Sequence, residues 1–210
     1  MFSRQPTRLI AIAAAAIALG GGAYGIGNGA AASPPGSPGG ASNARSGPAS
    51  GGTIGTVDGA SASSFTLTTP AGQKVTVEKA VSSASVKKGE NVLVLGTVGG
   101  TAITARTIIA EPTNGSAKSA AAGVVPFQHG SPSTAKQVGS IPASYHQGSG
   151  TIVNGTTANK ATEAALAAYP GGIVDRVVKL GNGEYEVHTI GVDWPHHIFV
   201  SRAFKVVGAD

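Results

Sequence analysis

Residues 53–111 contain five short β-branched segments, and this pattern constrains the fold more than any other feature of the sequence. The segments are TIGTV, SFTLTT, KVTVE, NVLVLGTV and AITARTII, separated by turns such as DGAS, PAGQ and KKGE. Short β-branched runs between Gly-rich or polar turns are typical of strands. Five of them in about sixty residues predict a small antiparallel barrel.

Hydrophobic periodicity gives this barrel an inside and an outside. Phe65 and Leu67 occupy alternate positions of one segment, and Val75 and Val77 do so in the next, which predicts strands with one buried face. The run at 92–95 is apolar at every position. A run that is apolar on both faces predicts a central strand.

Two longer strings in the same stretch, GTIGTVDGASASSFTLTTPAG and VKKGENVLVLGTVGGTAITARTI, carry the pattern G-x-V, F-x-L, K-G-x-x-V-x-V-x-G and I-x-A-x-x-I. With this pattern, the stretch of residues 53–111 resembles an uncharacterised family of exported bacterial OB-like domains. The resemblance implies a fold but no activity. Many OB barrels bind single-stranded nucleic acid, but that needs several aromatics along a basic groove. This stretch has one aromatic, Phe65, so we expect no nucleic-acid partner.

The N-terminal residues 1–32 have the layout of a signal peptide. Arg4 and Arg8 precede an uncharged, mostly apolar run, and Ala30 and Ala32 fit a small-residue cleavage rule before Ser33. The alternative is an uncleaved signal anchor, which would be the protein's membrane contact. Either way we expect an extracytoplasmic protein, secreted or associated with the cell envelope. The chain has no Cys, so no disulfide supports it.

Two further stretches have the composition of linkers. Residues 33–52 are rich in Pro, Gly, Ser and Ala, and residues 112–156 are a second low-complexity stretch without hydrophobic periodicity. Such segments bury too little apolar surface to offset their ordering entropy. We therefore expect two modules joined by disordered linkers, one at 53–111 and one at 157–210.

The C-terminal module reads as one helix followed by an antiparallel sheet of three to four strands, an α+β arrangement. TTANKATEAALAAYPGG has helical spacing, with Thr157 or Asn159 as the expected cap and Pro170 as the stop. IVDRVVKL and EYEVHTI around GNG predict a hairpin. With the terminal FVSRAFKVVGAD, this module resembles the PepSY family. The resemblance implies an inhibitory or peptide-contacting role, as in protease propeptides, and generally no catalysis.

The stretch GVDWPHHIFV, at residues 191–200, holds the only Trp and two adjacent His. A turn at 192–195 would place His188 and His197 diagonally on the outer sheet face, with Asp193 nearby. These three are the candidate metal ligands. A diagonal pair starts far apart, however, and a solvated sheet face with Trp194 capping the end of the hairpin explains the residues better. We therefore expect no functional metal site.

The same hairpin offers the best partner-contact candidates, Trp194 and Phe199, because large apolar side chains dominate interface energies. No catalytic motif or cofactor fingerprint is recognisable, and we expect no enzyme and no cofactor. The expected function is a binding or regulatory module in the envelope, with a secreted peptidase or another envelope protein as partner. The alternative is a structural spacer without a defined ligand.

Overall fold

The computed structural model describes residues 48–80, 85–110 and 136–210. The signal sequence predicted at 1–32, residues 33–47 of the first predicted linker (33–52) and residues 112–135 of the second (112–156) lie outside these residues. The described residues all belong to one compact unit. In the described residues no helix has the length and apolar character needed to span a membrane.

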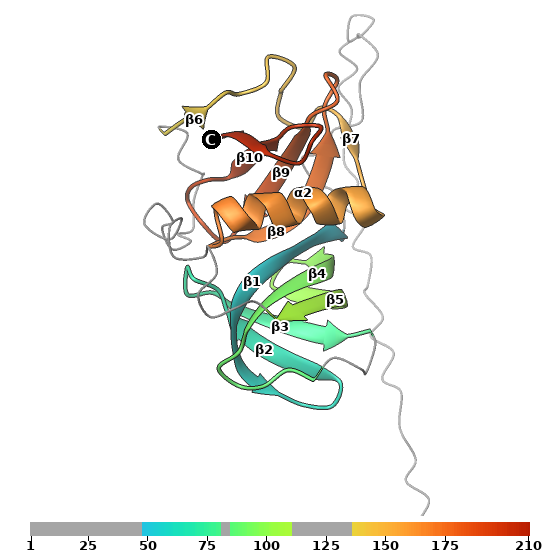
Figure 1. Ribbon diagram of the computed structural model, residues 1–210, viewed down its shortest axis with the longest axis vertical. Helices are drawn as coiled ribbons and strands as arrows, with labels where there is room; N and C mark the ends of the chain where they lie inside the picture. The colour runs from blue at the N-terminus through green and yellow to red at the C-terminus, as the bar shows by residue number, and fades with distance from the viewer. Residues whose placement is uncertain (1–47, 81–84, 111–135) are drawn as a thin grey trace, which may run out of the picture. The chain divides into compact units, whose positions relative to one another are not determined.

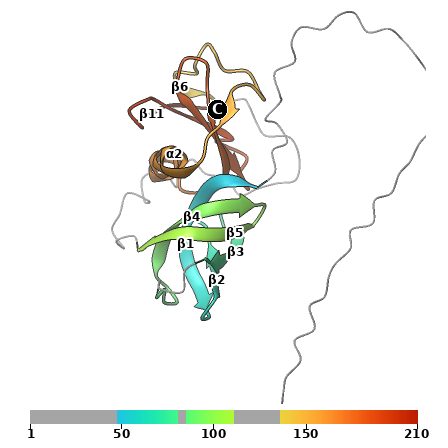
Figure 2. The same cartoon turned by 90° about the vertical axis from the view of Figure 1, so that its right-hand side faces the viewer.

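Five strands form a closed barrel (Figures 1 and 2). They are β1 (Ala49–Ala60), β2 (Ser64–Thr68), β3 (Lys74–Lys79), β4 (Asn91–Gly99) and β5 (Ala102–Ala110). Around the barrel the order is β1, β2, β3, β5, β4 and back to β1. All neighbours are antiparallel except β3 and β5, which are parallel. The predicted five-stranded barrel is therefore confirmed, but its expected antiparallel pairing fails between β3 and β5, because a closed ring with an odd number of strands cannot alternate direction throughout.

The barrel interior confirms the predicted alternation. Phe65, Leu67, Val75 and Val77 are all buried in one apolar cluster. Residues 92–95 are buried on both faces, as predicted for a central strand. Their even-numbered members face the barrel interior, whereas the odd-numbered ones pack in a second cluster together with helix residues.

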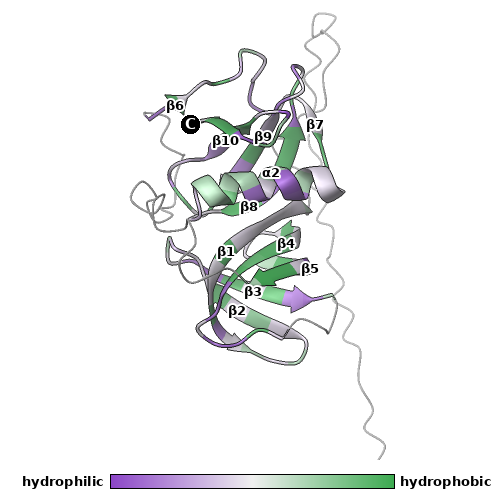
Figure 3. Ribbon diagram, in the orientation of Figure 1, coloured by the Kyte–Doolittle hydropathy of each residue, from purple (hydrophilic) through white to green (hydrophobic). Residues whose placement is uncertain are grey.

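The remaining elements extend the same sheet beyond the barrel. They are β6 (Val138–Gly139), β7 (Thr151–Ile152), α2 (Gly155–Ala168), β8 (Ile173–Lys179), β9 (Tyr185–Ile190), β10 (His197–Val200) and β11 (Val206–Ala209). Strands β8, β9, β10, β11 and β6 follow one another with antiparallel pairing, and β7 pairs with β8. Apolar residues run along β8 and β9 (Figure 3). The predicted hairpin of 173–190 is confirmed.

Strand β1 connects the barrel to these elements. Gly52 pairs with Val174 of β8, and the Thr53 hydroxyl donates a hydrogen bond to the Gly172 carbonyl over 2.9 Å. Leu93 and Leu95 of β4 belong to the apolar cluster that also contains the buried face of α2. The barrel and the C-terminal elements thus share both a sheet and a core.

The described residues differ from the predicted segment boundaries at three places. Strand β1 starts at Ala49, inside the segment assigned to the first linker, and residues 136–156 of the second predicted linker contain β6 and β7. Helix α2 begins at Gly155 with Asn154 at the N-cap, before the expected cap residues. The additional strand residues are ordered by backbone pairing with distant strands, although their side chains show no periodicity.

Candidate functional site

The face of β8, β9 and β10 opposite to α2 carries polar and charged side chains. In the observed register His188 lies directly opposite His197, and Glu186 opposite Phe199. The alternate residues of these strands, Tyr185, Val187, Ile198 and Val200, belong to the apolar cluster that contains the buried residues of α2. The diagonal arrangement predicted for His188 and His197 is wrong by two residues, because pairing of β9 with β10 ends at His188 and leaves a longer connection than the expected turn.

This polar face is covered rather than solvated. Arg176, Glu186, His188 and His197 are all buried. Residues 136–150 pass over them: the Tyr145 ring lies 5.3 Å from the His197 ring, centroid to centroid, and β6 extends the sheet at β11. Burial raises the pKa of Tyr145. The expectation of a solvated face is therefore wrong, because part of the predicted linker packs on it.

Three imidazole rings gather under this cover. The ring centroids of His188 and His196 are 4.2 Å apart, those of His196 and His197 4.7 Å, and those of His188 and His197 5.3 Å. The Nε2 atoms of His188 and His196 share a hydrogen bond of 2.8 Å. We call His188, His196 and His197 the histidine cluster.

Two of these rings are hydrogen-bonded through Nδ1 to a carboxylate. Asp175 lies 2.5 Å from Nδ1 of His188, and Glu186 lies 2.7 Å from Nδ1 of His197. Arg176 forms an ion pair with Asp175 at 3.2 Å. Buried charges are stable in proteins only when paired in this way. Each carboxylate orients its ring so that Nδ1 donates and Nε2 points elsewhere.

The third ring stays neutral. Burial, together with the neighbouring His188, His197 and Arg176, lowers the pKa of His196 to about 3, while Asp175 opposes this shift. At neutral pH the imidazole of His196 is therefore uncharged and keeps a nitrogen lone pair. With the side chains as they stand, the described residues contain no group of three or more His, Asp or Glu that could hold a metal ion.

The sequence identified part of this cluster. His188 and His197 were candidates, and the structure brings them together; Asp193 lies half-buried in the connection between β9 and β10. The carboxylates that contact the rings are instead Asp175 and Glu186. His196 was missed as a ligand candidate, although its adjacency to His197 was visible. Its position depends on the hairpin register, which the sequence did not determine.

The predicted partner contacts are buried. Trp194 is 6% exposed and Phe199 0%. The indole Nε1 of Trp194 donates to the Lys136 carbonyl over 2.6 Å, and its ring meets Tyr169 edge-on. A docking residue must be reachable, so we do not retain Trp194 and Phe199 as contacts. The physical reason is again that residues 136–150 cover this side of the sheet.

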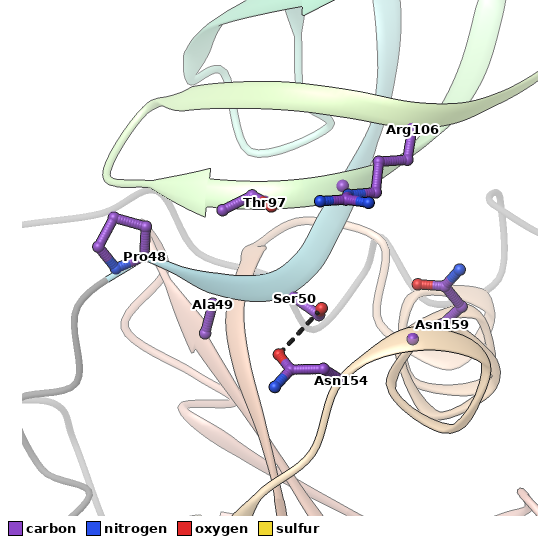
Figure 4. A pocket seen from close by; sticks show the side chains of 9 residues that line it. Pro48, Ala49, Ser50, Thr97, Arg106, Asn154 and Asn159 are labelled. Atoms are coloured by element: carbon purple, nitrogen blue, oxygen red, sulfur yellow. Dashed lines mark hydrogen bonds between the residues drawn. The ribbon is translucent and has the colours of Figure 1, made fainter. Parts of the chain in front are cut away.

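A separate pocket of about 270 Å³ opens between the barrel and the start of α2 (Figure 4). Strands β1, β4 and β5 and the first turn of the helix supply its walls. It is lined by Pro48, Ala49, Ser50, Gly96, Thr97, Arg106, Asn154, Gly155 and Asn159. The lining therefore holds one cation and no acidic residue.

Two local features set the chemistry of this pocket. The Ser50 hydroxyl donates to the Asn154 side chain over 3.1 Å, so Asn154 does not cap the helix with its side chain (Figure 4). Arg106 is exposed and has no hydrogen-bond or ion-pair partner within the described parts of the chain. A guanidinium in this state is a donor of five N–H groups for an incoming carboxylate.

Comparison with known proteins gives no relative: no family model matches the chain, and neither curated proteins nor solved structures match it.

Proposed function

We propose that the protein is an exported, non-enzymatic binding module of the cell envelope, and that its pocket at Arg106 holds a carboxylate-bearing segment of another envelope protein. The observation that carries the proposal is Arg106, a cation without an ion-pair partner among the described residues, in a pocket whose lining contains no acidic residue. Arg binds carboxylates with two parallel hydrogen bonds, which gives both affinity and orientation. The amide side chains of Asn154 and Asn159 add donors and acceptors for a peptide backbone.

The fold also supports the resemblance of the barrel to OB-like domains and of the C-terminal elements to PepSY modules. The barrel order β1-β2-β3-β5-β4 is consistent with an OB-like domain. The buried face of α2 shares a core with β8, β9 and β10, as a PepSY-type helix and sheet would. A PepSY-type module suggests a secreted peptidase as the partner, which the protein would restrain.

The second candidate is the structural spacer, and burial of Trp194 and Phe199 favours it. Among the described residues the large hydrophobic side chains that stay exposed are Ile109 and Val138. They give no extended apolar patch of the kind that marks a docking surface. A spacer, however, does not require a pocket with an Arg that has no ion-pair partner in the described part of the chain.

Short peptides with a free carboxylate distinguish the two functions. We expect such peptides, titrated into the full ¹⁵N-labelled chain, to shift the backbone amide signals of Ser50, Thr97 and Asn159, while the same peptides with amidated ends bind at least tenfold more weakly. Arg106→Ala should weaken binding by roughly tenfold or more, since one charge-assisted hydrogen bond contributes about 1.5–3 kcal/mol.

The matched control is Arg202→Ala, which also removes an exposed Arg but lies outside the pocket lining. It should leave peptide affinity unchanged. Equal response to acid and amide peptides, or no shift at the pocket amides, would favour the spacer.

A further inference from the structure

We propose that the pocket at Arg106 receives the C-terminal end of a partner polypeptide whose last side chain is small, such as Ala or Gly, and not the carboxylate of an Asp or Glu side chain. This inference rests on the proposed function, because it names the kind of carboxylate that the same pocket holds. A terminal carboxylate is ionised at neutral pH and accepts two parallel hydrogen bonds from one guanidinium. The backbone at Arg106, the amide groups of the pocket and its size favour this ligand.

A β-bulge fixes the backbone of Arg106 at the pocket. The register of β4 and β5 shifts between Leu95 and Gly96, which pair with Thr107 and Ala105, so Arg106 is the extra residue between two paired ones. Bulges re-aim side chains and are frequent beside binding sites. Gly96, which also lines the pocket, allows the two strands to approach here, because a Cβ on it would lie 2.1 Å from a carbonyl oxygen of β5. The cation is therefore placed before a ligand arrives, which lowers the cost of binding.

Two side-chain amides lie on the other side of the pocket, those of Asn154 and Asn159 (Figure 4). The side-chain oxygen of Asn154 accepts a hydrogen bond from Ser50, which leaves its NH₂ group to donate. Within the described ranges the side chain of Asn159 has no hydrogen-bond partner. Amides of this kind can bond the N–H and C=O of a peptide group.

The chemistry next to the carboxylate decides which ligand these amides suit. In the last residue of a chain the final peptide group follows the carboxylate after a single carbon atom. In an Asp or Glu side chain, methylene groups precede the backbone instead and offer no hydrogen bond. A polar site rejects a ligand that leaves its donors and acceptors unmet. The amides of Asn154 and Asn159 therefore favour a chain end over an acidic side chain.

The size of the pocket limits the last side chain. Its volume of about 270 Å³ lies just below the roughly 300–1,000 Å³ of sites for drug-sized ligands. Its apolar side chains are those of Pro48 and Ala49, and both are small. A large last side chain would gain little apolar contact here and would compete with the carboxylate and the peptide group for space. The pocket therefore suits a chain that ends in Ala or Gly.

Four acetylated peptides of one parent sequence test the proposal by chemical-shift titration of the full ¹⁵N-labelled chain. The first ends in Ala with a free carboxylate, and the second is its amide. The third is an amide with one internal Glu, and the fourth ends in Phe with a free carboxylate. The first, third and fourth carry the same charge, so a difference among them comes from shape and hydrogen bonding. We expect the first to bind roughly tenfold more tightly than the others, or more.

A variant of the pocket separates the chain end from the acidic side chain. Asn159→Ala should weaken binding of the Ala-ended acid by roughly threefold to tenfold, since it removes one hydrogen-bonding group, and should leave the Glu-bearing amide unaffected. Ala is the most favourable residue in helices, so this variant should fold. The matched control is Gln147→Ala, which removes an exposed side-chain amide outside the pocket lining and should change neither affinity.

Two results would overturn the proposal. The first is equal binding of the Glu-bearing amide and the Ala-ended acid, and the second is equal binding of the Phe-ended and Ala-ended acids. In both cases the proposed function stands as long as Arg106→Ala abolishes binding, because a carboxylate at Arg106 is then still the ligand. If no peptide binds in a manner that depends on Arg106, the proposed function fails and this inference fails with it.

Discussion

At the scale of single residues, Trp194 joins three parts of the chain. Its indole N–H bonds to the Lys136 carbonyl, its ring meets Tyr169 edge-on, and the Lys136 ammonium lies 4.0 Å from its centroid. An aromatic ring with this many partners contributes through packing, through its hydrogen bond and through a cation–π contact. Residues 136–150 are therefore held to the sheet partly by one side chain of the hairpin.

Removing this side chain should destabilise the fold. We expect Trp194→Ala to lower the free energy of unfolding by about 3–5 kcal/mol, because it leaves a cavity and an unpaired carbonyl. The emission of Trp194 in the parent chain should be blue-shifted and resistant to acrylamide. Urea denaturation measures the first effect, with Ile109→Ala as the control, since Ile109 is 40% exposed and should cost about 0.5 kcal/mol or less. A red-shifted emission with unchanged stability would contradict the packing described here.

At the scale of elements, strand β1 can pair with both β4 and β8 only because two of its residues are glycines. A Cβ added to Gly51 would lie 2.0 Å from the Val174 carbonyl oxygen, and one added to Gly52 would lie 2.0 Å from the Val94 carbonyl oxygen. Both clashes are with backbone atoms, which cannot turn aside as a side chain can. The glycines thus let β1 lie between β4 and β8 at close range.

A pair of Gly→Ala variants in the same strand tests this. Gly51→Ala should lower the free energy of unfolding by about 2 kcal/mol or more, because the backbone of β8 must move away. Gly59→Ala meets no atom within 4 Å and should be neutral or stabilising by up to about 1 kcal/mol. Chemical denaturation of both variants gives the comparison. Equal stabilities would mean that β1 and β8 do not approach as closely as the structure indicates.

The elements that the sequence revealed are those with side-chain periodicity. Alternation identified β2 and β3, the apolar run at 92–95 identified β4, and the GNG turn identified the β8–β9 hairpin. Strands β6 and β7 were not predicted, because a two-residue strand is too short to show a periodic pattern of side chains and pairs through its backbone atoms. The histidine cluster was half visible for a related reason: its residues were noticed, but a two-residue difference in register decides whether they meet.

At the scale of the whole molecule, the question is whether the barrel and the C-terminal elements separate. Each was expected to be a module of its own, and that division stays a prediction. The structure gives them one sheet, joined at Gly52 and Val174, and one shared apolar cluster that includes Leu93 and Leu95. Shared burial of this kind couples the stability of two parts.

Cleavage of the chain between the barrel and the C-terminal elements distinguishes independent modules from one cooperative unit. We expect a chain with an engineered protease site within 111–135 to stay together after cleavage, with both pieces eluting as one species and unfolding in one transition. Residues 136–156 should resist proteolysis, since β6 and β7 pair with the sheet. Two separately eluting, separately folded pieces would establish independent modules instead. Size-exclusion chromatography and calorimetry provide both readouts.

The joint between β1 and β8 also bears on how the chain reaches this structure. Thr53 and Gly172, which bond to each other, are 119 residues apart in sequence. Contacts of such separation carry a high loop-closure entropy and form slowly compared with local hairpins. Until β8 arrives, the first half of β1 has one free edge, which other extended chains could pair with. Gly51 and Gly52 offer no side chain there to deter such pairing, so the speed of this late closure governs how long a newly made chain is prone to aggregate.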